Sequence, residues 1–116
     1  MMVLLNEAIE WIRDEVIGNV TKGQLGTGNT LATPNDTGLE APDATTIQDL
    51  TYTVSGNQVT FSFIKDNETG VGTTYREYGI YDNANNVDWT RFVFTELEAT
   101  DFEDWNIKIR MFFRSV

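Results

Sequence analysis

Apolar residues recur at every second position through most of the chain after residue 45, and this period constrains the fold more than any other feature. A period of two places alternate side chains on opposite faces of an extended strand, so each such segment predicts a strand with one buried face. The final segment, residues 105–114, alternates most regularly. Its apolar positions are Trp105, Ile107, Ile109, Met111 and Phe113. The other predicted strands are residues 46–54, 58–64, 73–81 and 87–97, which are separated by polar turns.

The pattern predicts a mainly β fold, an antiparallel β-sandwich or small open barrel with one N-terminal amphipathic helix. A chain of 116 residues has the size of a single domain. We expect residues 1–18 to form the helix, residues 19–45 an extended connector loop, and residues 46–116 the β-sandwich.

The predicted helix, residues 3–17, carries a wide apolar stripe opposite a charged side. The stripe consists of Leu5, Ile9, Ile12 and Val16, widened by Leu4, Ala8 and Trp11. The Gly18-Asn19 pair that follows is a stop signal. The pattern favours packing over a sheet of the same domain, and the width of the stripe leaves docking on a neighbouring subunit open as the alternative.

The composition excludes several classes of function. The chain has no cysteine and no histidine, which rules out disulfides, thiolate metal sites and Ser-His triads. We expect no enzymatic activity, no cofactor and no bound metal. A net charge of −10 at pH 7 disfavours nucleic-acid binding. It is typical of proteins from salt-loving hosts, although mildly acidic proteins of ordinary hosts share it. No segment approaches the roughly 20 apolar residues of a membrane span, and the start lacks the features of a signal peptide.

Two polar stretches, residues 66–70 and 82–88, crowd oxygen ligands as Ca²⁺ loops do. The second lacks the glycine and the final glutamate that an EF-hand loop requires. We interpret both stretches as ordinary turns.

The stretch of residues 26–40 fits neither a helix nor a regular strand, yet its composition is that of a shaped loop. Its distinctive residues are Gly26, Gly28, Pro34, Asp36 and Thr37. The glycines permit positive φ or close approach of another backbone, the proline fixes a bend, and the Asp-Thr pair bonds backbone amides in turns. A domain of this size has little reason to order such a loop alone, so an intersubunit contact is one interpretation. An ordinary surface loop is the other.

Glu77 lies on the predicted third strand and Arg91 on the next one. Opposite charges on neighbouring strands predict a cross-strand ion pair. We expect this pair to fix strand register or a subunit contact rather than to serve catalysis.

Four short motifs carry a resemblance to a known family. Residues 26–28 have the sequence GTG, 34–40 PNDTGLE, 77–82 EYGIYD and 91–94 RFVF. In this order after one helix, they resemble a family of small virion proteins of tailed bacteriophages and tailed archaeal viruses, of the tail-fibre or baseplate type. The chain departs from the family pattern after Glu40, where APDATT replaces an expected basic residue. The matching positions are Gly26, Thr27, Gly28, Pro34, Asp36, Thr37, Leu39, Glu40, Glu77, Gly79, Ile80, Tyr81, Asp82, Arg91 and Phe94.

The resemblance implies a non-enzymatic structural subunit of the virion, located at the tail tip, baseplate or fibre base. Its partners would be copies of itself and other virion proteins. A capsid decoration or turret protein is the close alternative. A function of another class, recognition of a host glycan by a carbohydrate-binding β-sandwich, would use Trp89, Trp105 or Tyr81.

The outward positions of the last strand hold three of the eight basic residues, Lys108, Arg110 and Arg114. We expect them either to dock an acidic partner such as a neighbouring copy, or to cover apolar surface with their stems. The candidate assembly contacts are Gly26, Thr27, Gly28, Pro34, Asp36, Thr37, Leu39, Glu40, Glu77, Arg91, Lys108, Arg110 and Arg114.

Overall fold

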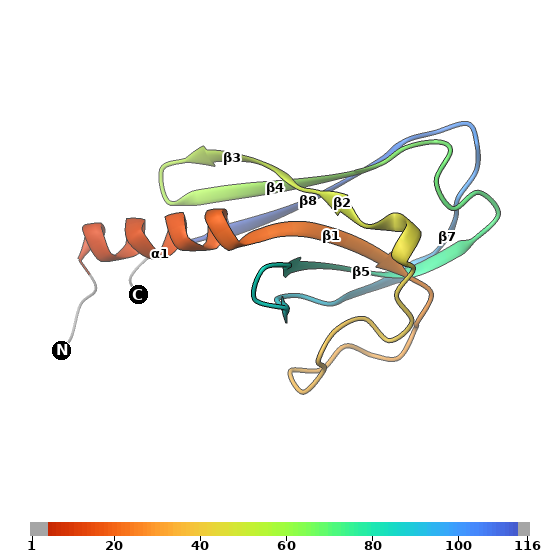
Figure 1. Cartoon of the computed structure of the whole chain (residues 1–116), viewed down its shortest axis with the longest axis horizontal. Coiled ribbons are helices and arrows are strands. Elements are labelled where there is room, and N and C mark those ends of the chain that lie inside the picture. The colour runs from red at the N-terminus through yellow and green to blue at the C-terminus, as the bar shows by residue number, and fades with distance from the viewer. Residues whose placement is uncertain (1–4, 114–116) are drawn as a thin grey trace.

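The computed structural model describes residues 5–113 and shows a mainly β fold with two antiparallel sheets and one N-terminal helix (Figure 1). The predicted fold class is therefore confirmed. In chain order the elements are α1 (Asn6–Asn19), β1 (Val20–Gly26), the 3-10 helix η1 (Ala44–Thr46), β2 (Gln48–Asp49), β3 (Thr51–Ser55), β4 (Gln58–Lys65), β5 (Thr74–Asp82), β6 (Val87–Asp88), β7 (Phe92–Glu98) and β8 (Trp105–Phe112).

The strands form one larger and one smaller sheet. The larger sheet has the order β2-β1-β5-β6, with β7 also paired to β5, and the smaller has the order β3-β4-β8. The chain passes from the larger to the smaller sheet at Leu50, between β2 and β3. Among the described residues, β7 and β8 each pair with a single strand, so they are edge strands.

Two predicted strands are divided in the structure. Residues 46–54 contain β2 and β3, which belong to different sheets, and residues 87–97 contain β6 and β7. The second division follows from Thr90, whose hydroxyl accepts the Ile80 amide at 3.2 Å in place of a backbone partner. Alternation alone does not distinguish one strand from two consecutive ones.

The connector predicted for residues 19–45 is also wrong in its first part. Residues 20–26 form β1, a central strand that pairs with β2 on one side and β5 on the other. The strand is concealed in the sequence because Gly23 occupies an inward position. A Cβ atom on Gly23 would lie 2.6 Å from Cδ2 of Phe63, so the packing of the two sheets requires the missing side chain.

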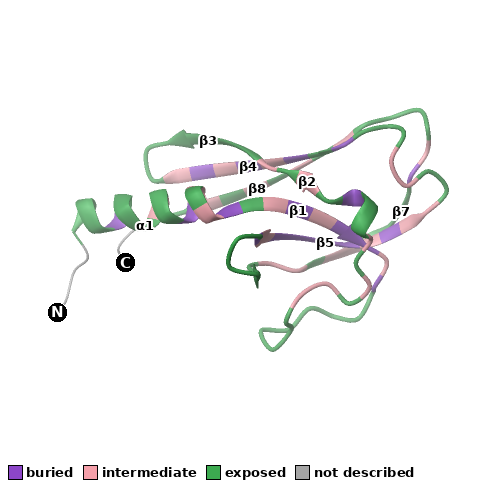
Figure 2. Ribbon diagram, in the orientation of Figure 1, coloured by how far each residue is buried: buried purple, intermediate pink, exposed green. Residues whose placement is uncertain are grey.

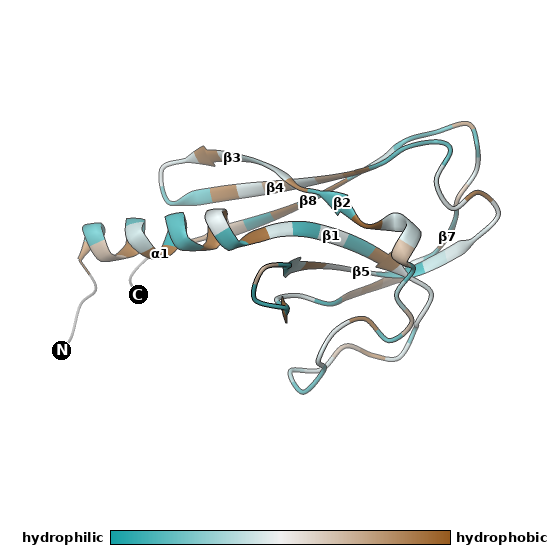
Figure 3. Cartoon of the chain, in the orientation of Figure 1, coloured by the Kyte–Doolittle hydropathy of each residue, from teal (hydrophilic) through white to brown (hydrophobic). Residues whose placement is uncertain are grey.

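The core lies between the two sheets (Figure 2). Val59, Phe61 and Phe63 are fully buried, as their alternation predicts, and hydrophobic bands alternate with polar ones along β4 (Figure 3). The ring of Tyr78 on β5 packs against Phe63 with centroids 5.1 Å apart. The inward positions of β8 are half-buried and its outward positions are exposed, which confirms the predicted alternation of that strand.

The inward face of β4 ends in a buried cation, Lys65. Its Nζ donates to the carbonyl oxygens of Asp66 at 2.7 Å and Thr69 at 3.1 Å. The same atom lies 4.9 Å from the centroid of the Trp105 ring. Carbonyl dipoles and the face of an aromatic ring therefore solvate this charge in place of a carboxylate.

The helix α1 projects from one end of the sandwich and continues directly into β1 (Figure 1). Ile9 and Val16 are each 5% exposed, so the domain covers part of the apolar stripe. By contrast, Leu5 is 73% and Trp11 65% exposed, so the domain leaves these positions of the stripe uncovered, and Leu4 lies outside the described residues. Of the helices within residues 5–113, none combines the length and apolar character needed to cross a membrane.

Candidate functional site

The carboxylate of Glu77 on β5 joins three separate segments of the chain. Its Oε1 accepts hydrogen bonds from the Glu40 amide and from Nε of Arg91, each at 2.8 Å. Its Oε2 accepts from the amides of Gly28 and Ala41, also at 2.8 Å. The side chain is 0% exposed. Because a carboxylate has about four acceptor positions, every one of them is occupied.

Arg91, just before β7, bridges two carboxylates. Its Nε pairs with Glu77 at 2.8 Å and its Nη1 with Oδ2 of Asp36 at 3.0 Å. The predicted ion pair is therefore confirmed, although Arg91 lies just before the strand rather than on it, and Asp36 on the loop is an additional partner. The Arg91 side chain is 6% exposed, and its Nη2 has no hydrogen-bond partner within residues 5–113.

Residues 27–41 form a loop, here called the Ω-loop, whose two arms meet at a narrow neck. The Thr27 amide donates to the carbonyl oxygen of Ala41 at 2.9 Å. Just outside this contact, Gly26 and Pro42 form an isolated β-bridge. Compact surface loops whose ends lie close together have this form. Glu77 thus closes a loop whose arms already contact each other.

The motif glycines are explained by close approach rather than by positive φ. A Cβ atom on Gly26 would lie 2.5 Å from Oε2 of Glu77, and one on Gly28 would lie 2.6 Å from the same oxygen. A Cβ on Gly79 would lie 2.6 Å from the carbonyl oxygen of Thr90 and 3.2 Å from Cδ2 of Leu39 on the loop. Side chains at Gly26 and Gly28 would push the loop away from Glu77, and one at Gly79 would push away the segment before β7 as well.

The tip of the Ω-loop is a turn closed by its own side chains. The turn spans residues 33–36 with Pro34 in its second position, and the Asp36 amide closes it by donating to the carbonyl oxygen of Thr33 at 3.1 Å. The Asp36 carboxylate in turn accepts from the Thr33 amide at 3.0 Å. The predicted roles of the proline and the aspartate are confirmed, whereas Thr37 forms no hydrogen bond with the described part of the chain.

At the other end of the loop, Glu40 ties the second arm to the first. Its Oε1 accepts from the Asn29 amide at 3.2 Å, and its Oε2 accepts from the Thr30 hydroxyl. We expected a loop of this kind to need a partner for its order, and that premise is wrong. The carboxylates of Glu77, Glu40 and Asp36 bind five backbone amides of the loop within the domain itself.

The hydrogen bonds around Glu77 also determine its charge. Burial by itself would raise the pKa of Glu77, but the amide donors and the Arg91 guanidinium outweigh it, and the pKa lies below its ordinary value. The pKa of Asp36 is also lowered, first by the Thr33 amide, against some desolvation, and then by Arg91. Glu77 is therefore an anion at neutral pH with no acceptor position left over. This chemistry holds backbone in place and offers no base to a substrate.

The remaining candidates lie away from this site. Lys108 and Arg110 are exposed on the outward side of β8, and Arg114 lies outside the described residues. Of the residues considered for glycan contact, Trp105 is half-buried against the edge of Tyr75, with ring centroids 5.9 Å apart. Tyr81 is half-buried as well.

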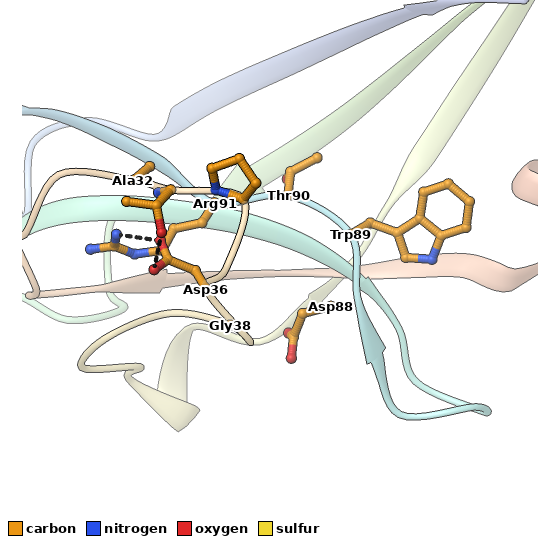
Figure 4. Close-up of a pocket in the computed structure, with 9 residues that line it drawn as sticks. Ala32, Asp36, Gly38, Asp88, Trp89, Thr90 and Arg91 are labelled. Carbon is orange, nitrogen blue, oxygen red and sulfur yellow. Dashed lines mark hydrogen bonds and ion pairs between the residues drawn. The ribbon is translucent and has the colours of Figure 1, made fainter.

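Trp89 differs from these aromatics because it is 45% exposed and borders a hollow of about 390 Å³ (Figure 4). The hollow lies between the Ω-loop and the segment that precedes β7. Figure 4 shows the Trp89 indole on one side of the hollow and the Asp36–Arg91 pair on the other. The polar side chains of its lining are Thr33, Asp36, Asp88, Thr90 and Arg91.

The two stretches considered as Ca²⁺ loops are turns closed by their own hydrogen bonds. Oδ1 of Asp66 accepts from the amides of Glu68 at 3.0 Å and Thr69 at 2.9 Å. The Asp82 carboxylate accepts from the amide and the side chain of Asn85. Across residues 5–113, no group of three or more acidic side chains is arranged to hold a metal ion.

Sequence reasoning identified Glu77, Arg91 and both arms of the loop, but it missed the backbone amides that complete the site. An amide donor is present at almost every residue, so no residue type signals it. The burial of Lys65 did have a signal, since it continues the inward alternation of Phe61 and Phe63. No protein-family model, curated protein or solved structure matches the chain.

Replacing Glu77 by glutamine is expected to lower the free energy of unfolding by about 3 kcal/mol or more, because a buried guanidinium loses its partner and an amide NH₂ faces backbone donors. Urea denaturation measures this change. The matched control is Glu96→Gln, which removes the exposed 3.0 Å ion pair with Arg76. That control should cost no more than about 1 kcal/mol. Equal losses in the two variants would contradict the role assigned to Glu77.

The stability of the protein should also depend on Glu77 at acid pH. Because the folded pKa lies below the ordinary value of 4.5, the unfolded chain binds more protons in this range. The contribution of Glu77 is fully present above the ordinary pKa and is lost as the pH falls through the lowered folded pKa. Urea titrations at a series of acid pH values should therefore show a shallower decline in Glu77→Gln than in the parent protein. Parallel declines would refute this linkage.

Proposed function

We propose that the protein is a non-enzymatic structural subunit of a tailed virus particle, joined to copies of itself or to other virion proteins. The observation that carries the proposal of assembly is the uncovered flank of α1. Trp11 is 65% exposed, and the neighbouring Ile12, between the buried and exposed sides, is 39% exposed. Adjacent large apolar side chains on the surface of a helix mark an interaction site.

The motif resemblance supports the location in a virion, and the site gives that motif set a structural meaning. Gly28, Asp36, Glu77 and Arg91 come from the four motifs, and their hydrogen bonds hold the Ω-loop on β5. Motif residues with this role maintain the conformation of the Ω-loop, which is a structural role rather than a catalytic one. The tail tip, baseplate or fibre base is the proposed location, and a capsid decoration or turret is the alternative.

The test is whether the chain is part of purified particles. Density-gradient particles from the source culture should contain this chain, by mass spectrometry, in a constant ratio to the other virion proteins. A Trp11→Glu variant should be incorporated less, because a charge replaces the apolar contact. The control Phe102→Glu alters an aromatic residue that is 90% exposed in the β7–β8 connection, and it should leave incorporation unchanged. Expression in infected cells without incorporation would overturn the proposal.

A second function, recognition of a host glycan, is favoured by the hollow beside Trp89. An exposed indole next to carboxylates and hydroxyls is an arrangement that suits sugar rings, which stack on aromatic faces and hydrogen-bond at their edges. The purified protein should then bind a set of oligosaccharides on a glycan array. Trp89→Ala should abolish that binding while Trp11→Ala retains it. No binding by the parent protein, or equal loss in both variants, would exclude the hollow as a glycan site.

A further inference from the structure

The basic residues of this acidic chain are nearly all engaged within the domain. In the part of the chain that the structure describes, four arginines or lysines form ion pairs and one lysine is buried against carbonyl oxygens. The side chains of Lys108 and Arg110 form neither an ion pair nor a hydrogen bond with residues 5–113. Both are exposed on the same side of β8. They are therefore the cations available to a partner.

These two cations lie on a sheet face without carboxylates. The strand registers align Thr51, Ser62 and Lys108 in one row, and Thr53, Thr60 and Arg110 in the next. On the neighbouring strands, only hydroxyl side chains thus stand level with the two cations. None of the outward positions of β3, β4 and β8 is aspartate or glutamate, in a chain with 18 such residues. The outward face of the smaller sheet is consequently a basic surface on an acidic protein.

The helix α1 presents the complementary pattern. Glu7, Trp11 and Glu15 are four residues apart and so form one row along the helix, about 6 Å between neighbours. All three are exposed, Trp11 to 65%. The row therefore offers two carboxylates with an uncovered indole between them.

The two rows are similar in spacing, and when Trp11 lies against Phe112 one carboxylate of the helix row lies opposite Arg110. Lys108, Arg110 and Phe112 are two residues apart on β8, about 6.7 Å between neighbours. Phe112 is 63% exposed and provides an apolar contact for the indole. A three-stranded face is about 10 Å across between its outer strands, which is the diameter of one helix.

We propose that the Glu7–Trp11–Glu15 row of one copy docks on the outward face of β8 of a second copy, against Lys108, Arg110 and Phe112. This inference rests on the proposed assembly function and names the contact through which copies join. The two surfaces are different parts of the chain, so the contact is head-to-tail and repeats into a ring or an open filament. Attraction between the exposed charges weakens as salt increases.

Crosslinking tests the contact directly because the chain has no cysteine of its own. Ala8 is exposed beside Trp11 on α1, and Thr60 lies on the central strand of the receiving face. A mixture of the full-length variants Ala8→Cys and Thr60→Cys, treated with a short bismaleimide, should give a heterodimer. The control pairs Ala8→Cys with Asn83→Cys, an exposed turn position. Equal yields for the two mixtures would overturn the proposal.

Charge exchange provides an independent test. The double variants Glu7→Lys/Glu15→Lys and Lys108→Glu/Arg110→Glu should each lose self-association in sedimentation, whereas their mixture should associate again through the reversed pair. Melting by circular dichroism verifies that each variant is folded. Asn83→Asp/Asn86→Asp adds charge elsewhere and should associate as the parent does. A mixture that stays monomeric, or a monomeric parent protein, would overturn the head-to-tail contact. The particle analysis decides the proposed function separately, because other contacts can incorporate the chain.

Discussion

The saturated carboxylate of Glu77 is the interaction on which the arrangement of this domain depends. A buried charge is tolerated only when its hydrogen-bonding capacity is filled, and here three amides and one guanidinium fill it. The donors come from both arms of the Ω-loop and from Arg91, just before β7. One side chain on β5 therefore determines where a long, irregular segment lies. Because every donor is needed, displacement of either loop arm would leave charge uncompensated, which couples the segments to one another.

Most of the positive charges, like Glu77, are also engaged within the domain. An acidic chain with few cations places most of them where they stabilise its own structure. Arg91 bridges two carboxylates, and Lys65 is solvated by carbonyl oxygens and an indole. The outward face of β8 departs from this rule. That contrast, rather than exposure alone, distinguishes the face from the rest of the surface.

The parts of the fold that sequence reasoning predicted are those whose signal is local. The strands β4 and β8 match residues 58–64 and 105–114 closely because each buries one face and alternates throughout. β1 was predicted only as a short extended piece at the start of the connector, because Gly23, an inward position, has no side chain to show the period. The Glu77–Arg91 pair was predicted from two opposite charges on adjacent strands, whereas the amide donors carry no residue identity. The covered part of the α1 stripe depends on tertiary packing, and the spacing of the apolar residues in the sequence does not reveal it.

The direct passage of α1 into β1 has a mechanical consequence. No linker separates the two elements, and Val20 both caps the helix and begins the strand. Figure 1 shows the helix and the strand running in nearly the same direction. A tensile load applied to the helix is thus transmitted along β1, at right angles to the hydrogen bonds that join it to β5. Such a load shears all of those bonds together instead of breaking them one after another, and an element mounted in this way resists extraction by force.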